Sequence, residues 1–258
     1  MEAIADVRRT PADWEEPLAR VGLVAKGVSY VLVGALAAGV AAGVGGSTTS
    51  RQGALHQLAG NLFGEVVLVL LVAGFAAYAL WRIAQAVQDD EWTKRLGYLG
   101  RAAIYASLTF SAAKILAGAG GGSQNAKTHR TTAVVLGWPG GREIVIAGGL
   151  AAIGVGLWNL YRGVTRKFED KWRGHSEAGS AVGVVGHVAR FVVFALIGIF
   201  AIRAAVDYDA KQAVGLDGAL QKLAHASYGS VLLGLTAAGL VAYGLYCFVD
   251  ARYRDVTR

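Results

Sequence analysis

The feature that most constrains the fold of this chain is a series of long apolar runs without charged residues. About twenty helical residues are needed to cross roughly 30 Å of hydrocarbon. Four runs approach or exceed that length, at residues 27–44, 66–81, 144–161 and 223–249. Two shorter runs, 102–113 and 191–202, have a cation at each end whose long side chain can reach the headgroup layer. The sequence therefore predicts an all-α, polytopic membrane protein with six transmembrane helices.

The composition agrees with helices packed in lipid. The 258 residues are 54% hydrophobic and 17% charged, and they include 36 glycines. This is too apolar for an ordinary soluble domain, whereas glycine lets helices approach closely in a bilayer. The net charge of +7 comes from basic residues in short segments between apolar runs, so we expect membrane anchoring and no nucleic-acid partner. The one cysteine, Cys247, excludes an intrachain disulfide.

The distribution of Lys and Arg predicts an orientation. With six crossings, the side that carries both termini has about twice as many of these cations as the other side, which places both termini in the cytoplasm. The first eighteen residues contain no apolar core that resembles a signal peptide. Trp14, Leu18 and Val21 could instead form a short amphipathic helix on the inner membrane surface.

An internal repeat is the strongest pattern in the chain. The motif Gly-x-x-[Ala/Gly]-[Lys/Arg]-x-x-x-[Tyr/Phe] begins spans one, three and five, at Gly22, Gly97 and Gly186. The second spans also correspond, in the sets Gly74, Tyr78 and Trp81; Ala151, Val155 and Trp158; and Gly239, Tyr243 and Tyr246. We therefore predict three helical hairpins of one orientation, related by a pseudo-threefold axis along the membrane normal. They follow a cytoplasmic segment (1–18) and occupy residues 19–90, 91–173 and 174–258.

On these motifs, the chain resembles the bacterial integral membrane proteins catalogued as domain of unknown function 1206. The likeness runs from about Arg20 to Arg254 and includes the Gly-Ala-Leu-x-x-Leu-Ala connectors at Gly53 and Gly218. Residues 131–141, the middle connector, depart from the pattern. The resemblance implies a location in the bacterial plasma membrane and supplies no activity, catalytic residue or cofactor.

Three cations occupy equivalent places in the repeat: Lys26, Arg101 and Arg190. Threefold packing would bring them together in a ring that binds an anion or a lipid headgroup. The alternative is that each cation reaches separately to inner-leaflet phosphates. The sequence leaves both readings open.

Small residues indicate where helices pack closely. Gly74 and Gly239 are equivalent packing positions, and Ala35, Gly39 and Gly43 form a stripe along the first span. Gly39 replaces a cation that the other two units carry as Lys114 and Arg203. The stripe could face another helix of this chain or a partner subunit.

Two acidic residues lie near the outer ends of spans. Glu65 and Glu143 have Lys114, Arg142 and Arg203 as plausible ion-pair partners, and an ion or proton relay is the alternative. The histidines lack metal-ligand spacing, and no nucleophile and base can be paired. We therefore expect no metal, no cofactor and no enzymatic activity.

Two functional hypotheses follow. The first is a structural or accessory subunit that packs against lipid, a larger membrane complex or a second copy of the chain, as the scarcity of intramembrane polar groups suggests. The second is a small anion-handling channel or transporter along the pseudo-threefold axis.

Overall fold

The computed structural model describes residues 14–43, 62–118 and 124–255, and their regular structure is helical. Eight α-helices lie within this part of the chain: α1 (Glu15–Ala41), α3 (Leu62–Gln88), α4 (Trp92–Leu116), α5 (Gln124–Leu136), α6 (Gly141–Val164), α7 (Glu177–Val206), α8 (Leu216–Ala224) and α9 (Gly229–Tyr253). Two short 3-10 helices, η1 (Glu169–Lys171) and η2 (Ala210–Gln212), lie in connectors. The all-α prediction is confirmed.

Five of these helices are long and apolar enough to cross a membrane: α1, α3, α6, α7 and α9. The short run at 191–202 is part of the 30-residue α7, which is long enough to cross a bilayer. The run at 102–113 lies in α4, which has 25 residues but also carries Lys94, Arg95, Arg101 and Lys114. The structure therefore supports a membrane protein with five apolar spans, and α4 is not among these five.

The segments around the spans differ partly from expectation. The predicted surface helix at Trp14, Leu18 and Val21 is not a separate element, because α1 runs without a break from Glu15 to Ala41. Leucines at three- and four-residue steps predict a short helix in the first connector, at Leu55, Leu58 and Leu62, and in the third, at Leu220 and Leu223. The helix of the third connector is present as α8. Residues 44–61 of the first connector fall outside the described residues.

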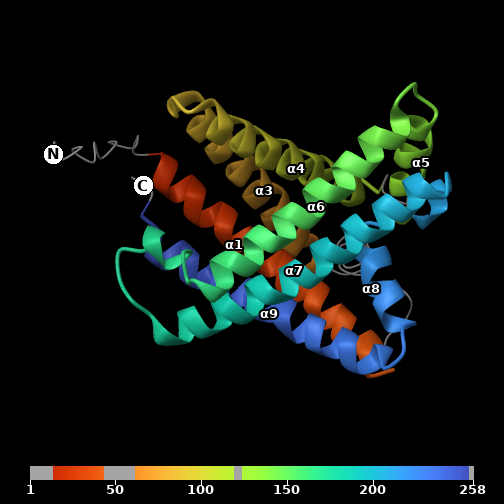
Figure 1. Ribbon diagram of the computed structural model, residues 1–258. Coiled ribbons are helices and arrows are strands. Elements are labelled where there is room, and N and C mark those ends of the chain that lie inside the picture. Colours follow the sequence, from red (N-terminus) through yellow and green to blue (C-terminus); the bar gives the residue numbers. More distant parts are fainter. Residues whose placement is uncertain (1–13, 44–61, 119–123, 256–258) are drawn as a thin grey trace, which may run out of the picture.

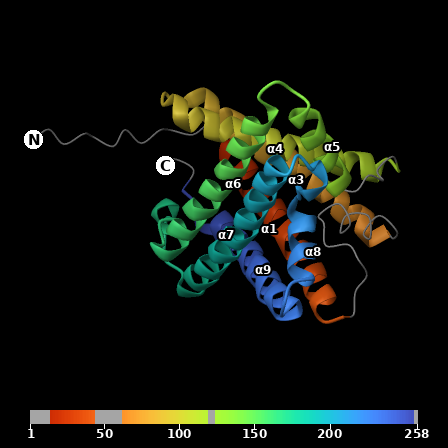
Figure 2. The same ribbon diagram turned by 45° about the vertical axis from the view of Figure 1, so that its right-hand side comes forward.

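Six long helices, the five apolar spans and α4, follow one another around an incomplete ring. In spatial order they are α4, α3, α1, α9, α7 and α6, and each packs against the next. Figures 1 and 2 show that α4 and α6, the two ends of this series, diverge toward the side where both termini lie. We call that side the termini end. A closed threefold ring would need one more contact, between α4 and α6, and these helices make no extended contact in the described structure.

Close glycine contacts explain the packing at the centre of this series. A Cβ added at Gly27 on α1 would lie 2.8 Å from the Gly244 carbonyl oxygen on α9, and the reciprocal distance is also 2.8 Å. Seven residues further along α1, Gly34 makes the same kind of approach to the Ala237 carbonyl oxygen of α9. Only glycine permits such backbone proximity, so α1 and α9 form a tight central pair.

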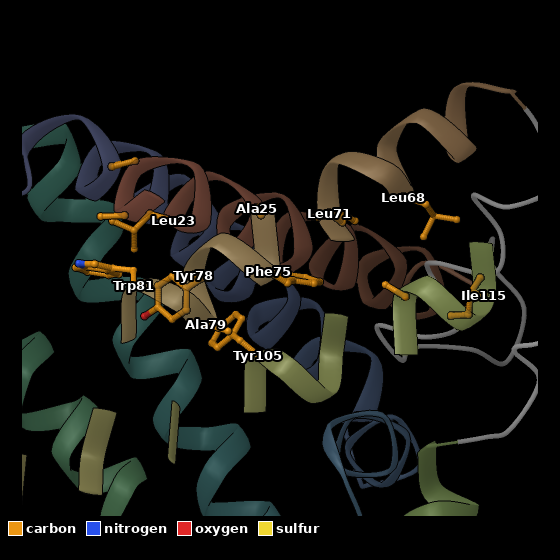
Figure 3. Packing of buried hydrophobic residues seen from close by; sticks show 13 residues of the cluster. Leu23, Ala25, Leu68, Leu71, Phe75, Tyr78, Ala79, Trp81, Tyr105 and Ile115 are labelled. Atoms are coloured by element: carbon orange, nitrogen blue, oxygen red, sulfur yellow. The ribbon is translucent and has the colours of Figure 1, made fainter. Parts of the chain in front are cut away.

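Two apolar clusters flank this central pair. Figure 3 shows the first, in which Leu23 of α1, Leu71 and Phe75 of α3, and Tyr105 of α4 are buried together. The second joins α1, α7, α8 and α9 and includes Leu240, Tyr243 and Tyr246, with Phe168 and Trp172 from the connector after α6. The connector is therefore part of the core and closes the termini end of that half.

Candidate functional site

The clearest polar site lies where α1, α7 and α9 meet at the hydroxyl group of Tyr243. The Lys26 ammonium donates a hydrogen bond to this oxygen at 2.9 Å, and the Arg190 guanidinium donates another at 2.6 Å. Tyr243 is buried, and its ring also lies 5.1 Å from the Lys26 nitrogen and 4.5 Å from the Arg190 guanidinium carbon. Two of the three repeat-equivalent cations thus converge on one phenol.

This site has an excess of hydrogen-bond donors. A phenol oxygen has two acceptor positions, and both are used by Lys26 and Arg190, so the hydroxyl proton remains available for donation. Among the described residues no carboxylate forms an ion pair with Lys26 or Arg190, and Nε of Arg190 is buried without a hydrogen-bond partner. Uncompensated cations in an apolar interior are costly. The arrangement is therefore complementary to a small anion.

Arg101, the third equivalent cation, does not join this pair. Its guanidinium carbon lies 5.9 Å from the Tyr98 ring on α4, and that of Arg82 on α3 lies 5.8 Å from the same ring. The predicted ring of Lys26, Arg101 and Arg190 is therefore replaced by a pair and a separate third cation. The physical reason is that α4 packs on α3 and not on α6, which turns the middle unit away from the threefold arrangement.

A second group of cations lies near Arg101 at the termini end. The Arg82 guanidinium donates to the Tyr78 hydroxyl and to the Gln85 amide oxygen, each at 2.6 Å. Its carbon also lies 4.2 Å from the Trp81 ring, and that of Arg254 lies 5.5 Å from this ring. Arg82 and Arg254 are therefore brought together by one buried indole.

Asp250 neutralises only part of this group. Its carboxylate accepts a hydrogen bond from Arg254 at 2.5 Å and one from the Trp172 indole nitrogen at 3.0 Å. Backbone bonds between the connector and the end of the chain, such as Asp255 N–H to the Lys171 carbonyl at 2.7 Å, hold these residues in place. The connector is thereby fixed to the end of α9, and Lys171 is held beside Arg254.

The pKa of Lys171 reflects its burial and the positive charges around it. Burial is the main cause that lowers the pKa of its ammonium group, to about 8. Nearby positive charges act in the same direction, namely Arg254, Arg82, Arg162 and Arg101. Because like charges disfavour protonation of a lysine, this shift indicates a local excess of cations.

The other predicted site residues lie apart from these groups. Among the described residues, none of Glu65, Lys114, Glu143 and Arg203 forms an ion pair with another, and the two cations lie over Phe110 and Phe200. Gly74 lies against Ala25, and Gly239 lies against Ala189. Ala35 is exposed, and none of the residues in 14–43, 62–118 and 124–255 comes within 4 Å of a Cβ built at Gly39 or Gly43. The close contacts of α1 use Gly27 and Gly34 instead of that stripe.

The sequence patterns did not single out several residues of the two cation groups. Tyr78 and Tyr243 were recognised only as repeat-equivalent positions, although a phenol at one place in two units is a signal of a shared polar role. Arg82 follows Trp81 directly at the end of an apolar run, and Lys171 and Arg254 lie far from it in sequence. Their proximity depends on the fold of the connector, so no local pattern could reveal it.

The described part of the chain contains no group of three or more His, Cys, Asp or Glu residues arranged to hold a metal ion. The buried His187 lies 4.9 Å from the Phe168 ring in a stacked arrangement, and its Nδ1 is 2.7 Å from the Gly183 carbonyl oxygen. These contacts account for it as a packing residue of α7.

Comparison with known proteins agrees with the threefold repeat. The sequence profile of the family described as Domain of Unknown Function (DUF1206) matches residues 21–89, 96–166 and 185–254, one match for each two-helix unit. The chain belongs to the DUF1206 family. This DUF1206 protein is also similar to "Uncharacterized protein YxxB" of Bacillus subtilis (strain 168), with 28% identity over 98% of this chain and 96% of that protein. No solved structure matches it.

Proposed function

We propose that this protein binds a small anion at the site formed by Lys26, Tyr243 and Arg190, and that it acts as a small anion-handling channel or transporter. The observation that carries the proposal is the convergence of two cations on one buried hydroxyl without a carboxylate among the described residues. An anion would accept hydrogen bonds from all three groups and offset the cost of burying the charges. The proposed role is not enzymatic.

The depth of the site supports a function inside the membrane. Lys26 lies eleven residues after the first residue of α1, which corresponds to about 16 Å along a helix. Arg190 lies thirteen residues after the start of α7, at about 20 Å. Both cations therefore lie about three turns inside their helices, directly before the apolar runs 27–44 and 191–202, and their side chains donate to the buried Tyr243 hydroxyl, which draws them away from lipid phosphates.

The proposal includes a topology. We infer that α4 crosses the membrane as a sixth span, because it has the length of its neighbours and packs against α3. Both termini then lie on the cytoplasmic side of a bacterial plasma membrane, as the uneven distribution of Lys and Arg indicates. The three two-helix units share one orientation, so the site on Tyr243 lies between unit one and unit three.

Reconstituted flux measurements test this function. Purified protein in liposomes is expected to conduct or exchange small anions such as chloride or phosphate, and Lys26→Met/Arg190→Met should abolish that flux. Lys114→Met/Arg203→Met removes the same charge from repeat-equivalent positions that lack this phenol, and it should retain flux. Equal flux in both double variants, or none in the wild type across a range of potentials and pH, contradicts the proposal.

A second candidate is a structural or accessory subunit of a larger membrane assembly. It is favoured by Ala35 and Gly39 of the predicted stripe, since Ala35 is exposed and no described residue lies within 4 Å of a Cβ built at Gly39, whereas Gly43 lies beyond the end of α1 with a φ of +70°. Such a stripe suits contact with a helix of another protein. Purification in mild detergent should then recover a partner that is lost with Gly39→Leu and kept with Gly154→Leu, a substitution at another glycine with open space around it.

A further inference from the structure

The boundary between α4 and α6, here called the seam, lacks the close helix contact that the equivalent positions make in the other two units. In unit one, a Cβ added at Gly22 would lie 2.6 Å from the Tyr78 Cβ, and in unit three the Gly186 counterpart would lie 2.5 Å from the Tyr243 Cα. Gly97 is the equivalent position in unit two, and no atom of the described residues lies within 4 Å of a Cβ built there. Val155, which corresponds to the two tyrosines, is exposed.

The next helical turn shows the same difference. Gly74 packs against Ala25 in unit one, and Gly239 packs against Ala189 in unit three. In unit two the equivalent residues are Ala151, which is exposed, and Gly100, where an added Cβ has no neighbour within 4 Å in the described part of the chain. Two turns of helix that are sealed in the other units therefore present apolar faces on both sides of the seam.

Cations border this seam at the termini end. Arg101 belongs to α4 and Arg162 to the last turn of α6, so one lies on each side. Arg82 and Lys171 lie within electrostatic range of Arg101 and Arg162, respectively. Nε of Arg82 is buried without a hydrogen-bond partner among the described residues, and the Asp250 carboxylate is bound to Arg254, so it does not pair with Arg82, Arg101 or Arg162.

We propose that an anionic phospholipid occupies the seam between α4 and α6. Its phosphate lies among Arg101, Arg162 and Lys171, and its acyl chains lie along the exposed faces of Gly100, Ile104 and Val155. The cation group is complementary to an anion. The exposed faces of Gly100, Ile104 and Val155, here called the apolar strip, are complementary to hydrocarbon. A phospholipid has an anionic headgroup followed by acyl chains, so it matches the cations and the apolar strip together. Free phosphate would leave the strip uncovered, and an apolar protein helix would leave the cations without a counter-charge. This site is separate from the one on Tyr243 and does not rest on the proposed function.

Lipid binding to the delipidated, purified full chain tests the proposal. Native mass spectrometry and thermal unfolding are to be followed on addition of phosphatidylglycerol, phosphatidylcholine or inorganic phosphate. Phosphatidylglycerol is expected to bind saturably and raise the unfolding temperature, and the other two probes should have little effect. Arg101→Gln/Arg162→Gln should weaken phosphatidylglycerol binding by roughly tenfold or more, because each basic residue near an anionic headgroup contributes substantially.

Two further variants separate this site from general surface charge. Arg95→Gln/Arg252→Gln removes the same net charge from exposed positions of the same end and should leave the affinity unchanged. Gly97→Leu/Gly100→Leu fills the space beside the strip, so it should weaken lipid binding while the fold is retained.

Three results would overturn the proposal. One is equal binding of phosphatidylcholine, and another is an equal effect of inorganic phosphate alone. The third is a dimer in delipidated protein that Gly97→Leu/Gly100→Leu disrupts, which would show that a second copy of the chain covers the seam.

Discussion

Gly74 on α3 packs so closely against Ala25 on α1 that a side chain at position 74 would overlap the Ala25 Cβ. The same relationship joins Gly239 on α9 to Ala189 on α7. Each pair closes a two-helix unit one turn away from the repeat tyrosine. These contacts hold the first and third units together, and the middle unit lacks them.

Substitution of Gly74 by valine should therefore destabilise the protein. Overpacking a tight helix contact costs about 1–3 kcal/mol, and here the backbone of α1 would have to move. Thermal or denaturant unfolding in detergent measures the change. Gly39→Val is the matched control, because it is also a helical glycine but has nothing within 4 Å of an added side chain. An equal loss of stability in both variants would show that helix propensity, and not packing, is responsible.

Loss of the Asp250 carboxylate should be more damaging than loss of a surface ion pair. Asp250 holds Arg254 and the Trp172 indole in a buried position, and removing one member of a buried pair costs about 3–5 kcal/mol. Asp250→Ala should therefore lower the free energy of unfolding by that order.

Glu16→Ala provides the comparison for Asp250→Ala. Glu16 pairs with Arg20 at 2.6 Å on an exposed part of α1, so its loss should cost about 1 kcal/mol or less. Unfolding curves of the two variants, measured side by side, test the difference. Similar curves would mean that the contacts of Asp250 contribute little.

Stability should rise with pH as Lys171 loses its proton. The pKa of Lys171 is about 8 in the folded protein, below the value of 10.5 for an unperturbed lysine. Between these two values the unfolded chain binds more protons than the folded one, so the free energy of unfolding increases with pH in this window. Below about pH 8 both states are protonated, and the unfavourable contribution of the charge is fully present.

Lys171→Met isolates this effect. The variant should be more stable than the wild type near pH 7 in delipidated detergent, and the two should converge as the pH approaches 10.5. Thermal unfolding as a function of pH gives the comparison, and NMR titration of isotope-labelled methylated lysines gives the pKa itself. A wild-type stability that stays constant relative to the variant from pH 8 to 10.5 would contradict the assignment.

The position of α4 in the membrane can be tested with fusion reporters. If α4 crosses, reporters placed after Asp90 and after Lys127 should lie in opposite compartments. A reporter after Arg166, between α6 and α7, should lie with the one after Asp90 and serves as the control. Location of the first two reporters on the same side would mean that α4 does not span, and the six-span topology would be wrong.

Much of the architecture could be predicted because its causes are local. Apolar runs define helices in lipid, and they located α1, α3, α6, α7 and α9, although the run in α7 covered only residues 191–202 of a 30-residue helix. The repeat of Gly22, Gly97 and Gly186 predicted three related units, and the family matches show three repeats along the chain. Gly74 and Gly239 could be chosen as packing positions because their equivalence was visible in the sequence.

The cation sites could be predicted only in part. Lys26 and Arg190 were recognised as equivalent, but the hydroxyl that joins them belongs to Tyr243, more than fifty positions beyond Arg190. Arg101 carries the same motif and yet lies elsewhere, beside Arg82. A motif determines which residues are available, whereas their separation depends on which helices pack together.

The sequence by itself determined that the chain is helical, apolar and built from three copies of one unit, because helix formation and membrane insertion depend on neighbouring residues. The tertiary structure determined that these copies are unequal. Five contacts around the ring form, and the sixth, between α4 and α6, stays open because Ala151 and Val155 replace the glycine and tyrosine that seal the other units. That asymmetry results from long-range packing, which no single repeat encodes, and it separates Arg101 from Lys26 and Arg190.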